Sequence, residues 1–356
     1  MGRVLRSMHI RMRCMYIYNL PNNISAPNDL FNALHLVGDK LYAILLCPRI
    51  QHYLRRETIM PIRFVVLTDS HYHPRAEKDY GAPKMLTRSR EVLDAIPDAV
   101  NALEPEFVVH AGDLLCGGSS FNLPTHLYER SVDEVADVLD FIKAPFYCVP
   151  GNHDCDAQTG SMEAFARRFD LPNPLITADV SPGLRLALAN VYHACSGVEE
   201  GMGIWTDILD EHLRRAARDA ERDGCVLMLV LHTWVLPNHT PDRGVVKRVE
   251  TLMETLISHR AIAAVFTGHR HLNRIRMYRD ILIVDTACLV GFPLGFRLIE
   301  IGDDGLLKMR FHTLPLPDLS AASYARSPDW ENDRWQGEIH DRDTEILLPR
   351  LSQIRS

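Results

Sequence analysis

The sequence lacks the features that mark several classes of protein. Its eight cysteines are scattered over 356 residues and no two are separated by two residues, so we expect buried free thiols in a reducing compartment. No apolar run approaches the roughly 20 residues that a transmembrane helix needs. Basic residues are in deficit, 39 against 46 acidic ones, which argues against a partner such as duplex nucleic acid. These absences favour a cytoplasmic globular protein without a transmembrane segment.

Residues 1–59 differ in character from the rest of the chain. Basic side chains outnumber acidic ones there, and the apolar residues follow neither a period of 2 nor one of 3.6. The segment also lacks the apolar core and small-residue cleavage site of a secretory signal. Residue 60, a methionine, then opens the run MPIRFVVLTDSH. We interpret residues 1–59 as an extension outside the core that results from a mis-assigned start, with a targeting peptide and a partner-binding arm as alternatives.

Beyond this segment, five apolar runs each end in a polar motif. We expect strands at residues 62–68, 107–111, 145–149, 225–231 and 261–267. The motifs that follow them are DSH, GD, GNHD, a single histidine and GHRH. Stretches with helical spacing lie between the runs, and this alternation predicts an α/β domain. Because ligands bind beyond the carboxyl ends of strands in such domains, we expect the five motifs to meet in one site.

The pattern changes after the GHRH motif. Four short strands are expected in succession, at residues 273–278, 281–286, 296–301 and 308–314, and they predict a second, antiparallel element. Prolines 315 and 317 end it, so we place the catalytic domain at residues 60–317. Residues 318–356 are polar, and we interpret them as a C-terminal surface tail or a helix-bearing extension.

The motifs supply carboxylates, an amide and imidazoles but no thiolate. This mixture suits manganese, iron or zinc better than calcium. Asp113 could bridge two ions about 3.5–4 Å apart, the spacing that clamps the attacking and leaving oxygens of a phosphoryl displacement. A water between the ions would lose its proton near neutral pH and attack as hydroxide. His153 would face the substrate as an acid or an electrostatic stabiliser, and Asp154 could fix its tautomer.

In this order, the five motifs resemble those of the calcineurin-like metallophosphoesterase superfamily, over about residues 60–317. The resemblance implies a four-layer αββα sandwich of two mixed β-sheets, with His153 as the catalytic histidine and Asp154 as its partner. The purple acid phosphatase branch is disfavoured, because the residues after Asp113 do not form GDxxY. The resemblance also implies two groups of metal ligands: Asp69, His71 and His271 for one ion, Asn152, His232 and His269 for the other, and Asp113 bridging both.

Within the superfamily, the compact size and the GFPLGFR run resemble class III cyclic nucleotide phosphodiesterases and related small bacterial phosphoesterases. This implies hydrolysis of a small phosphodiester, with a 3′,5′-cyclic nucleotide as the favoured substrate and manganese or iron as the favoured ions. A phosphomonoesterase or a nucleotide pyrophosphatase is the alternative within the same chemistry. A non-catalytic metal-binding scaffold is the alternative from another class, and the complete ligand set argues against it. His73, His193 and Arg270 could contact the substrate, with loop or surface packing as the other interpretation.

Overall fold

Two six-stranded β-sheets form the centre of the computed structural model, which describes residues 61–81, 83–194, 201–237, 244–302 and 304–351. The strand orders are β12-β11-β10-β1-β2-β3 and β4-β5-β6-β7-β9-β8. The first sheet contains β1 (Ile62–Leu67), β2 (Phe107–His110), β3 (Phe146–Cys148), β10 (Gly295–Ile301), β11 (Leu306–Thr313) and β12 (Thr344–Leu347). The second contains β4 (Leu175–Ser181), β5 (Leu184–Ala189), β6 (Val226–Val230), β7 (Ile262–Thr267), β8 (Arg274–Tyr278) and β9 (Ile281–Asp285).

Both sheets are mixed. In the first sheet β1, β2 and β3 run parallel, whereas β10 pairs antiparallel with β1. In the second sheet β5, β6, β7 and β9 run parallel, and β4 and β8 are antiparallel edge strands. Parallel strands place their carboxyl ends at the same edge of a sheet, which is where the polar motifs occur.

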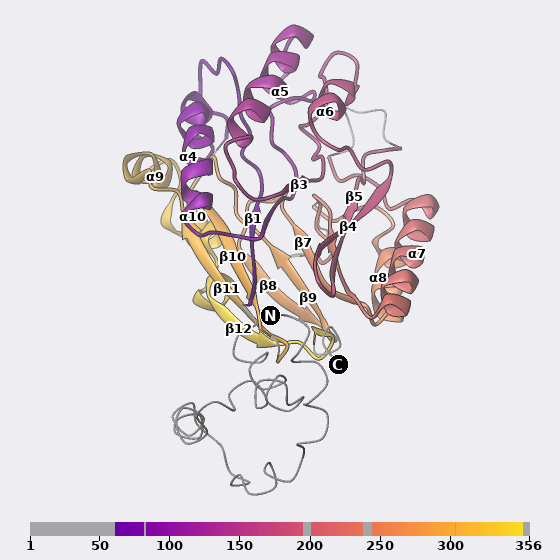
Figure 1. Ribbon diagram of the computed structural model, residues 1–356. Coiled ribbons are helices and arrows are strands. Elements are labelled where there is room, and N and C mark those ends of the chain that lie inside the picture. The colour runs from indigo at the N-terminus through magenta and orange to yellow at the C-terminus, as the bar shows by residue number, and fades with distance from the viewer. Residues whose placement is uncertain (1–60, 82, 195–200, 238–243, 303, 352–356) are drawn as a thin grey trace, which may run out of the picture. The chain divides into compact units, whose positions relative to one another are not determined.

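Helices cover the outer faces of the two sheets. The first sheet is covered by α4 (Ser89–Asn101), α5 (Thr125–Leu139), α6 (Glu163–Arg168) and α9 (Pro317–Tyr324), and the second by α7 (Asp207–Asp223) and α8 (Val249–Ser258) (Figure 1). Along β1, Phe64 and Val66 face the core between the sheets while Val65 and Leu67 face the helices. Burial on both faces explains the unbroken apolar run. The predicted four-layer αββα sandwich is confirmed.

The prediction of one separate antiparallel element after the GHRH motif is wrong. The hairpin of β8 and β9 belongs to the second sheet, where β9 pairs parallel with β7. The hairpin of β10 and β11 belongs to the first sheet, where β10 pairs with β1. The chain crosses between the two sheets in residues 286–294, so two locally similar hairpins complete different sheets.

The C-terminal segment packs against the domain. After α9 it forms α10 (Asp329–Gln336) and α11 (Ile339–Arg342), and β12 then pairs with β11 at the edge of the first sheet. Leu348 and Leu351 are buried in the core between the sheets. The predicted extension at residues 1–59 lies outside the described residues. Among the described helices, none has the length and apolarity needed to span a bilayer.

Candidate metal centre

The polar motifs converge at one edge of the sandwich. Asp69 and His71 follow β1, Asp113 follows β2, and Asn152 follows β3. His232 follows β6, and the GHRH motif follows β7. Side chains from both sheets therefore approach one another, as the rule for the carboxyl ends of parallel strands predicts.

The backbone is strained where it carries these side chains. Left-handed φ angles occur at five of the residues, namely Asp69 (52°), His71 (44°), Asp113 (56°), His269 (72°) and His271 (59°). Such angles cost non-glycine residues free energy, and they persist where the surrounding structure fixes them, commonly at functional sites. Glycine is required beside them: a Cβ at Gly151 would lie 2.1 Å from Asp113 Oδ1, and one at Gly268 would lie 2.5 Å from Asp69 Oδ2.

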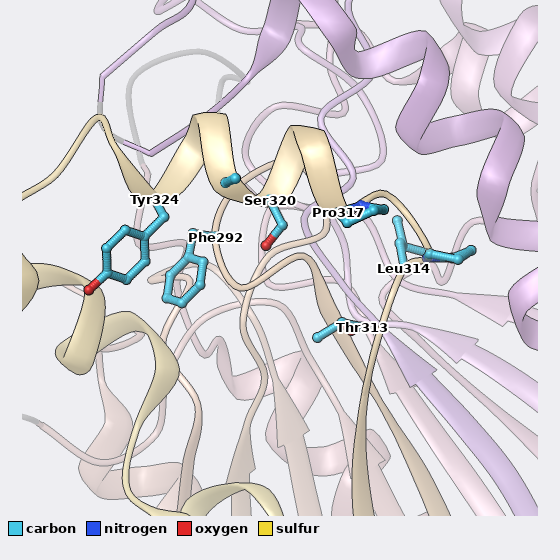
Figure 2. Close-up of a pocket in the computed structure, with 8 residues that line it drawn as sticks. Phe292, Thr313, Leu314, Pro317, Ser320 and Tyr324 are labelled. Carbon is cyan, nitrogen blue, oxygen red and sulfur yellow. The ribbon is translucent and has the colours of Figure 1, made fainter.

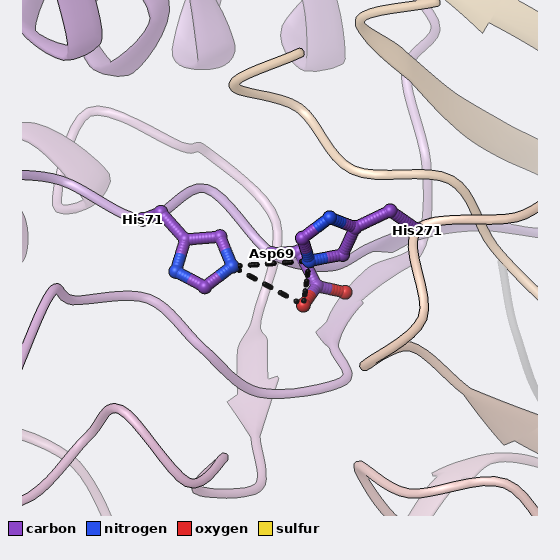
Figure 3. Close-up of side chains that lie close together, drawn as sticks. All are labelled: Asp69, His71 and His271. Carbon is purple, nitrogen blue, oxygen red and sulfur yellow. Dashed lines mark hydrogen bonds and ion pairs between the residues drawn. The ribbon is translucent and has the colours of Figure 1, made fainter. Parts of the chain in front are cut away.

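One group of possible ligands consists of Asp69, His71 and His271. Nε2 of His271 lies 3.1 Å from Asp69 Oδ1 and 3.2 Å from Nε2 of His71 (Figure 3). Nε2 of His71 lies 3.5 Å from the same carboxylate oxygen. All three side chains are buried or nearly so. Two ring nitrogens and an oxygen thus face a common point, as the ligands of a cation do.

A second group consists of Asp113, His232 and His269. Nε2 of His232 lies 3.1 Å from Asp113 Oδ2, and Nδ1 of His269 lies 3.0 Å from Oδ1 of Asn152. The same Asp113 oxygen lies 3.7 Å from Nε2 of His71 in the first group. The Asp113 carboxylate therefore stands between the two groups.

The buried polar atoms of His232 fit a metal ligand. Its Nδ1 donates a hydrogen bond to the Ala111 carbonyl at 2.7 Å, which orients the ring and directs Nε2 toward Asp113. Within the described part of the chain, Nε2 has no well-oriented hydrogen-bond partner although it is buried. Burial lowers the pKa of His232, but the Asp113 carboxylate outweighs this effect and raises the pKa to about 9. The site thus attracts a positive charge to this nitrogen.

His153 and Asp154 do not form the predicted pair. The ring Nδ1 of His153 lies 3.1 Å from the Gly117 carbonyl oxygen and donates a hydrogen bond to it, because a carbonyl oxygen can only accept. The buried Asp154 carboxylate instead accepts bonds from the backbone amides of Leu115 (2.9 Å) and Gly151 (2.8 Å). Burial, with a contribution from Asp113, raises the pKa of Asp154 to about 7. Asp154 therefore ties the loop after β2 to the loop after β3, while the Gly117 carbonyl orients His153.

A cavity of about 290 Å³ opens over these groups. Besides Asp113, Asn152 and three of the histidines of the motifs, it is lined by Arg270 of the GHRH motif and by Lys84, Arg334 and Trp335, which lie outside the motifs. Of the three weak candidates, only Arg270 borders it; the ring of His193 bonds to Thr206 Oγ1 at 2.8 Å, and His73 packs against Phe121. Lys84 lies in the loop before α4, and the sequence pattern gave no indication of its place. Arg334 and Trp335 belong to α10, far along the chain from every motif.

A larger cavity, of about 640 Å³, lies beside α9 (Figure 2). Its walls are mainly apolar and include Phe292, Leu314, Pro317 and Tyr324. Among the described residues, its lining contains neither carboxylate nor imidazole, and it shares no residue with the lining of the cavity over the metal centre.

Comparisons with known proteins agree with this geometry. Residues 62–273 match the family model described as calcineurin-like phosphoesterase. A dimetal phosphatase from Danio rerio has a similar fold, with a TM-score of 0.60 and 14% identity over 81% of this chain and 99% of that one. A probable cyclic nucleotide phosphodiesterase of Rhodopseudomonas palustris is 34% identical over 110 residues, which span 30% of this chain and 33% of the relative. The chain belongs to the calcineurin-like phosphoesterase family.

Proposed function

We propose that this protein is a metal-dependent phosphodiesterase with two ions in its active site, and that 3′,5′-cyclic nucleotides are its substrates. The observation that carries the proposal is the position of Asp113, whose Oδ2 lies 3.1 Å from His232 Nε2 and 3.7 Å from His71 Nε2. A carboxylate shared by two ligand groups is the arrangement that a pair of ions requires. The similarity to the Rhodopseudomonas palustris protein supports the choice of substrate.

The residues divide into two ligand sets that share Asp113. Nitrogen and carboxylate ligands favour manganese or iron, and zinc also fits them. When bound, the two ions supply Lewis-acid activation of the phosphoryl group and of the attacking water. The ligands proposed are Asp69, His71 and His271 for one ion, Asn152, His232 and His269 for the other, and Asp113 for both.

In this proposal, His153 and the cationic side chains that line the cavity act on the substrate. Because Nδ1 of His153 is committed to the Gly117 carbonyl, only its Nε2 is free to exchange a proton with the leaving oxygen. Lys84 and Arg270 line the same cavity and offset the charge on the phosphoryl oxygens. Asp154 holds the loops that carry Asp113 and His153, and its role is to position them.

One observation favours a second candidate within the same chemistry. Three cationic side chains, Lys84, Arg270 and Arg334, border a small cavity, whereas a diester carries a single negative charge. A phosphomonoester or a nucleotide diphosphate would use this excess of positive charge more fully. These classes therefore belong in the same assay.

Turnover of a substrate panel tests the proposal. The protein with added Mn²⁺ is assayed on cyclic AMP, cyclic GMP, a nitrophenyl diester, a nitrophenyl monoester and a nucleoside diphosphate ester. We expect the highest kcat/KM on the cyclic nucleotides. A higher kcat/KM on the monoester or the diphosphate would replace the phosphodiesterase assignment with the second candidate, and no turnover of any ester would contradict both.

A further inference from the structure

We infer that α10 (Asp329–Gln336) is part of the substrate pocket, and that Trp335 binds the planar base of a nucleotide. This inference rests on the proposed function, because it names the substrate class of the same site. The starting point is that Arg334 and Trp335, side by side on α10, line the cavity that also exposes Asp113, His153 and His269. A helix from the C-terminal segment thus borders a site whose ligands come from five earlier loops.

The end of α10 is fastened to the loop that carries His271. Asn273, two residues after His271, donates from its backbone amide to the Trp335 carbonyl (3.2 Å) and from Nδ2 to the Gln336 carbonyl (3.2 Å). Asn273 is itself fixed, since its Oδ1 accepts from Ala287 N (3.1 Å) and from the buried Arg297 (3.0 Å). The backbone at Trp335 is therefore bonded to the segment that carries His271.

The residue just after α10, Gly337, also packs closely against Asn273. Gly337 has a φ of +70°, and a Cβ there would lie 2.5 Å from the Asn273 carbonyl oxygen. At the other side, the buried Asn332 of α10 donates to the carbonyls of Tyr324 (2.8 Å) and Ser327 (3.1 Å). Bonds on both sides hold the helix, so Trp335 and Arg334 are presented to the cavity by a fixed backbone.

The chemistry of the lining explains what Trp335 can recognise. Apart from imidazoles, its indole is the one aromatic ring among lining residues that are otherwise cations, Asp113 and Asn152. Trp335 is half-buried, and the Arg334 guanidinium lies 5.8 Å from the centroid of its indole ring. Aromatic rings and arginine side chains stack on nucleobases, and this stacking shows little preference for one base over another. Lys84 and Arg270 remain available for the phosphoryl oxygens.

Binding of two product-like ligands tests the inference without requiring turnover. The affinities of the full-length, Mn²⁺-loaded protein for 5′-AMP and for ribose 5-phosphate are measured by calorimetry. These ligands share the phosphate and the sugar and differ only in the base. We expect 5′-AMP to bind roughly tenfold more tightly, as stacking of one base predicts, and 5′-GMP to bind about as tightly as 5′-AMP.

Four variants test whether the base preference depends on Trp335. Trp335→Ala should bring the ratio of the two affinities below about twofold, whereas Trp335→Phe should keep most of it because a planar ring remains. Trp330→Ala is the matched control, since Trp330 lies on the same helix, is 64% exposed and does not line the cavity. Trp335→Leu preserves bulk without a π face, and it serves if the alanine variant fails to fold.

The outcomes separate this inference from the proposed function. A base preference that survives in Trp335→Ala or Trp335→Leu, or equal or undetectable binding of the two ligands to the unaltered protein, would overturn the role of Trp335. Tight, Trp335-dependent binding of 5′-AMP by a protein that cleaves no phosphodiester would uphold that role and contradict the proposed function instead.

Discussion

At the scale of single residues, Asp113 is the side chain whose carboxylate lies between the two groups of possible ligands. If it bridges two ions, Asp113→Ala should lose most of the bound metal together with hydrolysis of cyclic nucleotides. Metal content per chain after desalting, measured beside the rate, checks this. Asp98→Ala is the matched control, since Asp98 is an exposed carboxylate on α4. An Asp113→Ala protein with two ions per chain would remove the bridging role.

His153 should fail in a different way from Asp113. Its ring lines the cavity and is oriented by the Gly117 carbonyl, so His153→Ala should keep its metal while kcat falls by on the order of 10²–10⁴. If His153 protonates the leaving oxygen, the loss should shrink for a nitrophenyl ester, whose leaving group needs no proton. Unchanged rates on both kinds of substrate would exclude His153 from the reaction.

The sequence could place some of these residues and not others, for a physical reason. The seven predicted ligands each follow an apolar run directly, so a local pattern and the rule for strand ends were enough to group them. Arg334 and Trp335 line the cavity on a helix whose end is bonded to Asn273, a contact between distant segments that no local pattern encodes. The orientation of His153 by a backbone carbonyl was equally invisible, because every residue has such a group.

At the scale of elements, Asp210 fastens α7 to α8. Its buried carboxylate accepts from Thr255 Oγ1 (2.6 Å), Arg214 Nε (2.7 Å) and Trp205 Nε1 (3.2 Å). Burial alone would raise its pKa, but these bonds lower the pKa below the usual value. A lowered folded-state pKa means that the stabilisation is present above the unfolded pKa of about 4 and is lost as the pH falls through the folded pKa.

Asp210→Asn should therefore lower the free energy of unfolding by about 1.5–3 kcal/mol at pH 7, the range for hydrogen bonds to a charged group. The difference from the unaltered protein should shrink below pH 4, where protonation removes the same charge. Urea unfolding of chelator-treated protein at several pH values measures this, and Asp219→Asn, with a more exposed carboxylate on α7, is the control. A deficit of the same size at all pH values would contradict the electrostatic explanation.

Strands were easier to predict than their assignment to a sheet. The apolar runs before the motifs became β1, β2, β3, β6 and β7, because burial on both faces leaves a continuous apolar pattern. The hairpins β8–β9 and β10–β11 have similar local patterns, yet they complete different sheets. That choice depends on pairing with β7 and β1, strands far away in the sequence, and so it could not be predicted from the hairpins themselves.

At the scale of the whole molecule, we predict that a chain beginning at Met60 folds and hydrolyses substrate as well as the full chain. The physical reason is that β1, an inner strand of the first sheet, begins at Ile62, and every proposed ligand follows it. Comparison of the two chains by thermal unfolding and by kcat/KM checks the prediction. Loss of folding in the shorter chain would show that residues 1–59 contribute to the domain.

The dependence of hydrolysis on two bound ions tests the central claim most directly. The protein is stripped with a chelator, Mn²⁺ is added back stepwise, and ions per chain and the rate on cyclic AMP are measured on the same samples. We predict no hydrolysis in the stripped protein and full recovery as the content approaches two ions per chain. Full activity in metal-free protein, or complete recovery with a single ion per chain, would contradict the account.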